Sequence, residues 1–218
     1  MTDSILSING TGMQTLEILT LLTLIALLPS ILIMMTCFTR IVIVLSLLRN
    51  ALGLQQTPPN TVIIGIALFL SLFIMQPVIS DINQNAYEPY KSDLITQQQA
   101  IDNASVPLKK FMLKQTKIDS LNVFLNFADM KRPKNLMEIP MHIVIPAFMT
   151  SELSRAFLMG FLLYIPFLVI DIIVASVLMS MGMVMLPPSM ISTPFKLLLF
   201  VVVNGWSLLF STLVSSFN

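Results

Sequence analysis

One apolar stretch, from Ile143 to Leu186, constrains this chain more than any other feature. As a single straight helix it would measure about 66 Å at 1.5 Å per residue, roughly twice the thickness of a bilayer core. We therefore expect it either to break, near Gly160 or Pro166, or to project well outside the hydrocarbon. The chain is 56% hydrophobic and only 11% charged, against about 25% charged residues in soluble domains, which is the composition of a membrane protein.

Three further apolar stretches accompany it, from about Leu16 to Phe38, from Thr61 to Ile79 and from Met190 to Phe217. The first is long enough to cross a bilayer core of about 30 Å, and Pro29 should kink it. No Lys or Arg precedes Arg40, so this stretch lacks the basic region of a secretory signal. Two alternatives stay open: the stretch is retained, or a leader has been trimmed from the sequence.

These stretches divide the chain into three regions of one subunit. Residues 16–79 are predicted to form a first apolar hairpin, residues 80–141 a polar helical region, and residues 142–218 a second apolar hairpin. A proline pair lies in the link of each hairpin, at Pro58-Pro59 and Pro187-Pro188, which hints at the internal pseudo-symmetry that transporters show. The expected fold is all-α: membrane-associated helical hairpins with a small extracytoplasmic helical region.

Charge is concentrated in the polar region, where 15 of the chain's Asp, Glu, Lys and Arg residues lie between Asp81 and Glu138. Amphipathic stretches at Val106–Met112 and Leu121–Met130 predict helices there, whose polar faces are either ordinary solvated surface or partner contacts. The connection from Arg40 to Asn60 has two arginines and no acid, so the positive-inside rule predicts that it faces the cytoplasm. The polar region would then lie on the opposite side.

Methionines occupy alternate positions at Met179, Met181, Met183 and Met185, just before a proline pair. A period of two does not give one stripe on a helix, but in an extended or looped segment all four side chains would point the same way. Gly182 favours such a loop. Because methionine is deformable, a ring of these loops could form a soft seal around a pore. The alternative is ordinary packing against lipid or core near a helix end.

Four charges lie where lipid is expected: Glu152, Arg155, Asp171 and Lys196. A lone charge at membrane depth costs at least about 2.5 kcal/mol, so each needs a partner or water. Glu152 and Arg155 are three residues apart and can pair on one helix face. Glu152 and Lys196 would be about 40 Å apart within one chain at 1.5 Å per residue, so they could meet only between staggered copies.

Several kinds of chemistry lack the residues they need. There is no glycine-rich phosphate loop ending in Lys-Ser or Lys-Thr, and no His, Cys and carboxylate set with metal-ligand spacing. The one cysteine, Cys37, excludes an intrachain disulfide, and the one histidine, His142, follows a proline at a segment start. A net charge of +1 gives no indication of nucleic-acid binding. We expect no enzymatic activity, no cofactor and no metal.

Specific motifs carry a resemblance to a known family. They lie at Met35–Gly53, Gln55–Asn60, Ile145–Leu153, Phe167–Gly182, Pro194–Leu197 and Asn204–Trp206. On these residues the chain resembles the FliP family of flagellar export-gate proteins, whose injectisome relatives are called SctR. The resemblance covers nearly the whole chain from about Leu32. Thr39-Arg40-Ile41 and Thr57–Asn60 favour the flagellar branch.

The resemblance implies that several copies build a helical, conical assembly with two smaller membrane proteins, FliQ and FliR, among other export-apparatus and basal-body proteins. Unfolded export substrates would pass through it at the bacterial inner membrane, driven by proton-motive force and a separate ATPase. The family's constriction corresponds to Met183, Val184 and Met185, where the stiffer, β-branched Val184 departs from the methionine of many members. The family's charge pair between subunits corresponds to Glu152 and Lys196.

The sequence thus predicts a subunit of a homo-oligomeric flagellar export channel, with three alternatives. One is an SctR-like injectisome subunit. Another is a stand-alone ion- or proton-coupled transporter that uses Glu152 and Asp171 as carriers, although the chain has few spans for such a role. The third is a structural scaffold in which the methionines only pack.

Overall fold

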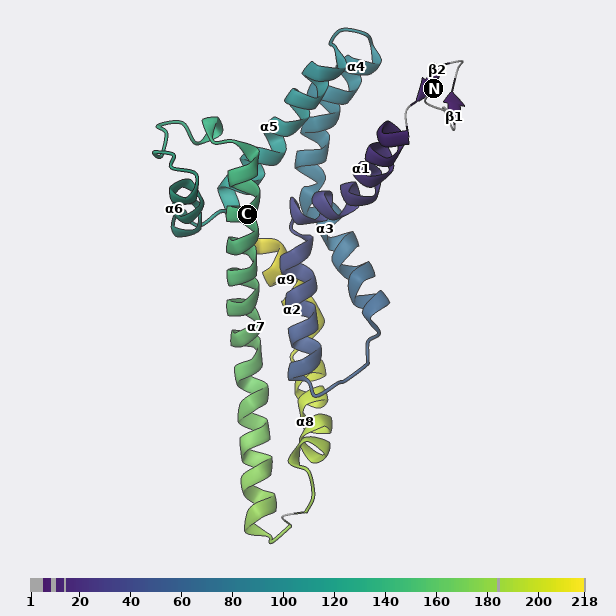
Figure 1. Ribbon diagram of the computed structural model, residues 1–218. Helices are drawn as coiled ribbons and strands as arrows, with labels where there is room; N and C mark the ends of the chain where they lie inside the picture. The colour runs from purple at the N-terminus through teal and green to yellow at the C-terminus, as the bar shows by residue number, and fades with distance from the viewer. Residues whose placement is uncertain (1–5, 9–10, 14, 184, 218) are drawn as a thin grey trace.

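The computed structural model describes residues 6–8, 11–13, 15–183 and 185–217, and it is built almost wholly from helices (Figure 1). A short antiparallel ribbon, β1 (Leu6–Ile8) with β2 (Thr11–Met13), precedes them and was not predicted. The helices are α1 (Thr15–Met34), α2 (Phe38–Ala51), α3 (Asn60–Ile82), the π-helical η1 (Asn83–Tyr87), α4 (Glu88–Lys91), α5 (Gln97–Gln115), α6 (Ile118–Phe127), the 3-10 turn η2 (Leu136–Glu138), α7 (Met141–Ser180), α8 (Pro188–Val202) and α9 (Gly205–Ser215). The all-α prediction is confirmed.

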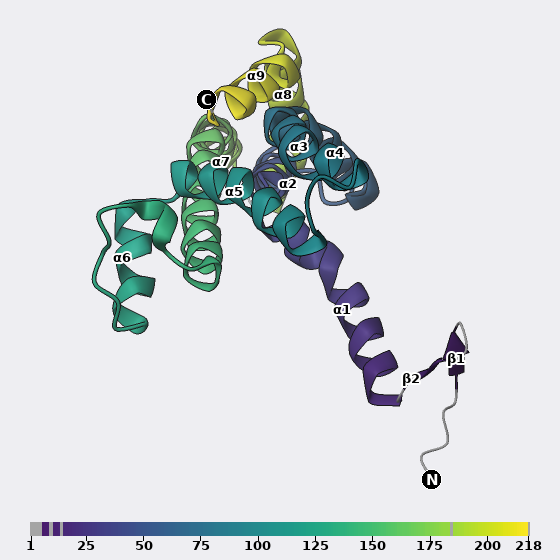
Figure 2. The ribbon, with the colours of Figure 1, turned by 90° about the horizontal axis from the view of Figure 1, so that it is seen from above.

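Helix α7 is the spine of the molecule and runs along most of its long axis (Figure 1). Helix α2 lies beside α7 and runs in the same direction, and α8 returns antiparallel to α7 after the turn at the lower end. The end of α3, with η1, α4 and the start of α5, projects from the other end; we call this projection the arm. Figure 2 shows α6 on the flank opposite α4, and α1 extending away from the body.

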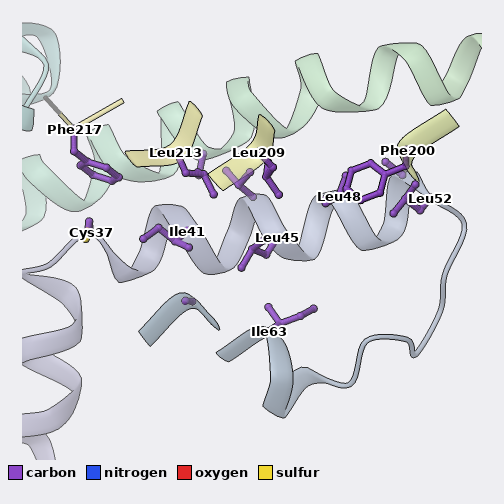
Figure 3. Packing of buried hydrophobic residues seen from close by; sticks show 14 of the residues in the cluster. Cys37, Ile41, Leu45, Leu48, Leu52, Ile63, Phe200, Leu209, Leu213 and Phe217 are labelled. Atoms are coloured by element: carbon purple, nitrogen blue, oxygen red, sulfur yellow. The ribbon is translucent and has the colours of Figure 1, made fainter. Parts of the chain in front are cut away.

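Helix α2 supplies the centre of the main hydrophobic core. Ile41, Val44, Leu45 and Leu48 are buried, at the spacing of three and four residues that places side chains on one helical face. Figure 3 shows Ile41, Leu45 and Leu48 between α7, the α8–α9 pair and Ile63 of α3. The sequence treated this segment as part of a connection between two apolar stretches, and the structure corrects that interpretation.

Helix α7 is continuous over 40 residues, about 60 Å at 1.5 Å per residue. The predicted break near Gly160 or Pro166 is therefore wrong, and the alternative, a helix that extends beyond one bilayer core, remains. Gly160 serves close packing instead, because a Cβ there would lie 2.1 Å from Cδ1 of Leu47 on α2. Pro166 is accommodated within the helix, as prolines are in apolar helices flanked by others.

The fourth apolar stretch, predicted as one segment from Met190 to Phe217, is instead divided into α8 and α9, which are bent by 65°. Asn204 adopts a left-handed conformation with φ of 50° at the junction, a conformation that Asn tolerates better than most residues. The bend folds α9 back so that Leu209 and Leu213 join the core around α2. It thereby brings the end of the chain to the start of α2.

By length and composition, two helices of the described residues could cross a membrane: Asn60–Lys91 and Met141–Ser180. The bent pair α8–α9 would make a third if it is counted as one span. Large apolar side chains along α7, such as Phe157, Phe161 and Ile173, are more than half exposed in the single chain. Such a surface needs lipid or protein to cover it.

Candidate functional site

A buried ion pair joins the start of α2 to α7. Arg40 donates through Nε to Oε2 of Glu152 over 2.8 Å, and through Nη2 to Oε1 of the same carboxylate. The two side chains are 1% and 0% exposed. Two parallel hydrogen bonds to one carboxylate are the strongest way for an arginine to pair, and they fix both helices in register.

The remaining donors of Arg40 tie this pair to the end of the chain. Nη1 donates to the carbonyl oxygen and the hydroxyl of Ser216, at 3.1 and 2.9 Å, and Nη2 donates to Gln115 on α5. The guanidinium carbon lies 3.7 Å from the ring centroid of Phe217, a cation–π contact. Gln115 in turn donates to the Phe217 carbonyl over 2.9 Å and accepts from Arg155 over 2.7 Å. Four helices meet at this network.

Arg40 is the site residue that the sequence analysis missed. It was counted as a positive charge on a cytoplasmic connection, whereas the structure buries it as the partner of Glu152. A signal was present, because Arg40 begins an apolar run with no acid nearby in the sequence. An arginine in such a run needs a carboxylate from elsewhere, and Glu152 lacked a partner other than Arg155. The predicted side of the membrane for this segment stays a prediction.

A second ion pair lies at the other end of α2. Lys196 on α8 donates to Oδ2 of Asp171 on α7 over 2.6 Å and to the carbonyl oxygen of Ala51 over 3.1 Å. Ala51 is the last residue of α2, and the last carbonyls of a helix have no partner within the helix. A lysine there also suits the negative end of the helix dipole. Ser192 donates to the other oxygen of Asp171 over 2.6 Å, so the carboxylate is held from two sides.

The methionine segment forms the turn between α7 and α8. Met179 still lies in α7, so the predicted non-helical conformation begins only after Ser180. Gly182 has φ of +76°, and hydrogen bonds from Gly182 to Met179 and from Met183 to Leu178 close the helix in the way typical of glycine-ended helices.

The methionine side chains of this turn are largely uncovered. Met179 and Met181 are 62% and 64% exposed, and Met185 is 98% exposed. Met183 is half-buried, and Val184 lies outside the described residues. This turn is the tip of a long hairpin, as Figure 1 shows. Methionines at such a tip are available to whatever approaches it.

Within the chain, Glu152 and Lys196 have separate partners, Arg40 and Asp171. The local alternative for Glu152 is present but weak, because Nη1 of Arg155 lies 3.9 Å from its Oε1. Asp171, predicted only as an unexplained charge in the apolar stretch, is the intrachain partner of Lys196. The pairing of Glu152 with Lys196 between copies concerns an assembly and stays a prediction.

The cavities and nucleophiles of the described residues offer little for catalysis. The apolar pocket between α7, α8 and α9, of about 380 Å³, is lined by side chains such as Met159, Phe167 and Leu209. No group of three or more His, Cys, Asp or Glu residues in the described part of the chain could hold a metal ion. Cys37 is fully buried and donates to the Ser71 hydroxyl over 3.3 Å, and burial raises the pKa of its thiol to about 11.

With this geometry established, comparison with known proteins decides the family. The model of the FliP family matches residues 21–213. The chain belongs to the FliP family. It is 53% identical over 204 residues to the flagellar biosynthetic protein FliP of Bacillus subtilis, covering 94% of this chain and 92% of that protein. The proteins of the same name from Aquifex aeolicus and Caulobacter vibrioides are 50% and 49% identical, over 96% and 100% of this chain and 89% and 84% of theirs.

These relatives confirm the predicted resemblance and its flagellar branch. The matched range takes in both ion pairs and the methionine turn of this FliP-family chain. Of the alternatives that the sequence left open, the injectisome and stand-alone transporter readings find no support in the names of these relatives.

Proposed function

We propose that this chain is a subunit of the flagellar type III protein-export gate, in the bacterial inner membrane at the flagellar basal body. Membership of the FliP family, with relatives about half identical over nearly the whole chain, carries this proposal. The apolar helices fit a membrane-associated component. In this function the chain helps to form the channel for exported proteins and to close it, and it catalyses no reaction.

The gate is an assembly of several copies with FliQ- and FliR-like membrane proteins. The exposed apolar face of α7 supports this proposal, since a single chain leaves Phe157, Phe161 and Ile173 uncovered. The unfolded flagellar proteins that cross the gate need a continuous path, and one long hairpin encloses none. Copies packed side by side around an axis would enclose one.

The methionine turn is the seal of that path. Met181, Met183 and Met185 lie at the tip of the α7–α8 hairpin, where copies around an axis would bring their tips together. Thioether side chains can close around each other when the path is empty and around an unfolded chain when it is occupied. The exposure of Met185 and the firmly capped helix below it suit such a contact.

The charge pair between copies is a separate part of the proposal. In the assembled gate Glu152 would be shared between Arg40 of its own chain and Lys196 of a neighbour. A double-mutant cycle of the neutral changes Glu152→Gln and Lys196→Met tests this by native mass spectrometry, because exchanged charges would face Arg40 and Asp171 within the chain. A combined loss of the oligomer smaller than the sum of the two single losses supports the pair, and strictly additive losses contradict it.

Deletion of this chain from its host tests the function itself. We expect loss of secreted flagellar rod, hook and filament proteins, with those proteins retained in the cell, and restoration by the unmodified chain. Purification of the tagged chain in mild detergent should recover FliQ- and FliR-like proteins with it. Normal secretion in the deletion strain would refute the proposal.

A further inference from the structure

Arg40 and Arg49, at the two ends of α2, use one nitrogen in the same way and the rest of the guanidinium differently. Nη1 of Arg40 donates to a carbonyl oxygen and a hydroxyl oxygen. Nη1 of Arg49 likewise donates to the Pro58 carbonyl over 3.2 Å and to Oδ1 of Asn60 over 2.7 Å. The edge formed by Nε and Nη2 holds both oxygens of Glu152 in Arg40, whereas in Arg49 it has no acceptor among the described residues.

The open edge of Arg49 has the geometry of an anion-binding group. Its Nε is buried, and a buried donor without an acceptor costs free energy, while Nη2 beside it still reaches solvent. None of the three ion pairs among the described residues includes Arg49, and no acidic residue lies between Ile18 and Ser80. A carboxylate or a phosphate ester from outside the chain would satisfy both nitrogens with two parallel hydrogen bonds.

An apolar pocket of about 110 Å³ adjoins Arg49. Four helices contribute to its walls, through side chains that include Leu48 of α2, Ile63 of α3, Phe200 of α8 and Trp206 of α9. Figure 3 shows Leu48 and Phe200 close together at this end of α2. The indole of Trp206 packs edge-to-face on Phe200, with ring centroids 5.2 Å apart, and it is exposed, so the pocket is reached from the surface. Such walls suit hydrocarbon.

The cation and the pocket lie at a boundary between polar and apolar surface. Asn60, which Arg49 binds, is the first residue of Asn60–Lys91, one of the two helices long and apolar enough to cross a membrane. The connection before Asn60 exposes polar side chains, among them Gln55, Gln56 and Thr57. Tryptophan is enriched at the level of the lipid headgroups, because its ring is apolar and its N–H is polar. The end of the helix and Trp206 therefore place Arg49 at the level of lipid phosphates.

We propose that Arg49 and this pocket form a binding site for an anionic phospholipid. The lipid phosphate accepts hydrogen bonds from Nε and Nη2 of Arg49, and part of one acyl chain lies against Phe200 and Trp206. Because no carboxylate of the described chain neutralises Arg49, a lipid with net negative charge binds in preference to a zwitterionic one. The site adds a ligand to the membrane assembly and does not depend on what the assembly exports.

The one tryptophan of the chain lines the pocket, so its fluorescence tests the occupant directly. The full chain is reconstituted in phosphatidylcholine vesicles that contain a small fraction of lipid with brominated acyl chains, because bromine quenches an indole that it contacts. The brominated lipid is phosphatidylglycerol in one series and phosphatidylcholine in the other. We expect brominated phosphatidylglycerol to quench Trp206 more strongly than the same fraction of brominated phosphatidylcholine.

Three variants assign the preference to Arg49. Arg49→Gln should lower the binding of phosphatidylglycerol relative to phosphatidylcholine about tenfold, the effect of losing one charge-assisted hydrogen bond. Arg49→Lys keeps the charge but not the two-pronged edge, so its loss should be smaller. Arg132→Gln is the matched control, because this exposed arginine lies in the polar region, outside the pocket, and its removal should leave the preference unchanged.

Equal quenching by the two brominated lipids in the unmodified chain overturns the site, whether or not the variants fold. An unchanged preference in Arg49→Gln overturns it as well. If that variant also loses FliQ- and FliR-like proteins on purification, Arg49 binds a carboxylate of a partner protein instead of a lipid. Each of these failures leaves the proposed export function standing, since secretion of flagellar proteins tests that function separately.

Discussion

An ion pair lies at each end of α2, and the two pairs differ in their access to solvent. At the start of α2, the side chains of Arg40 and Glu152 are 1% and 0% exposed. At its end, the Lys196 side chain is 4% exposed, but its partner Asp171 is 30% exposed. Arg40 makes a two-pronged contact, whereas Lys196 makes a single one that it shares with a carbonyl.

This difference assigns different mechanical roles to the two pairs. A fully buried charge cannot exchange its partner for water, so separating Arg40 from Glu152 costs a large free energy. This pair therefore acts as a fixed anchor. The Lys196–Asp171 pair, on the two helices that lead into the methionine turn, can be opened at lower cost because solvent reaches the carboxylate. The hairpin is thus rigid near α5 and more adaptable toward its tip.

Removal of Arg40 should have the largest effect of any single change. Arg40→Met leaves the Glu152 carboxylate buried with only Arg155, 3.9 Å away, so we expect a loss of about 3–5 kcal/mol in the free energy of unfolding. The melting temperature of the purified chain in detergent, and its accumulation in the membrane, measure this loss.

The matched control removes both charges. Arg40→Met combined with Glu152→Gln leaves no buried ion and should recover a large part of the lost stability. If the double variant is no more stable than Arg40→Met alone, the pair is not the reason for the loss, and the comparison between the two ends of α2 fails.

The second pair should respond less. Lys196→Met leaves Asp171 with its Ser192 hydrogen bond and with solvent, so we expect a loss of about 1–3 kcal/mol. Equal losses for Lys196→Met and Arg40→Met, in the same melting experiment, would remove the distinction between a fixed anchor and an adaptable one.

The tip of the hairpin should contribute almost nothing to stability. Met181→Ala with Met185→Ala removes side chains that are 64% and 98% exposed, so the melting temperature should change by the equivalent of about 0.5 kcal/mol or less. Met112→Ala is the matched control, because that methionine is 0% exposed and its truncation should cost about 2–5 kcal/mol. A large loss at the tip would show that these methionines pack within the single chain.

Labelling of the Cys37 thiol tests whether the start of α2 is rigid, and it is the most local of these measurements. It is 0% exposed, and because the pKa is raised to about 11, the thiol stays protonated and unreactive at neutral pH. Maleimide labelling of the folded chain should be slow at pH 7 and still slow at pH 9, and fast after denaturation at either pH. Rapid labelling of the folded chain at pH 7 would indicate that the start of α2 opens readily.

Composition and apolar length were sufficient to predict the helical class and the membrane character, because both depend on local hydrophobicity summed over long segments. They were not sufficient to place α2. Its two arginines suggested a polar connection, and only the fold reveals that Arg40 turns inward to Glu152, 112 positions later in the chain. A pairing at that separation leaves no periodic signal in the sequence.

The prediction of a break in α7 was wrong for a similar reason. Gly160 and Pro166 weaken an isolated helix, which is why they indicated a break. In the fold, Leu47 occupies the space over Gly160, and the packing of α2 along α7 favours the continuous helix. The methionine turn, by contrast, was predicted from local residues. Gly182 and the proline pair restrict the backbone conformation only within a few positions along the chain.

The most direct test of the account is ion leakage through the assembled gate. Met183→Ala with Met185→Ala is compared with Met149→Ala in cells that express the full complex. Met149 is half-buried and packs against the hydrophobic cluster that includes Met112, Leu125 and Phe148. If the methionine turn seals the path, the tip variant should leak small ions and solutes while its assembly stays normal, and the control should remain tight. Normal assembly and export without any leak in the tip variant would contradict the central claim that these methionines close the channel.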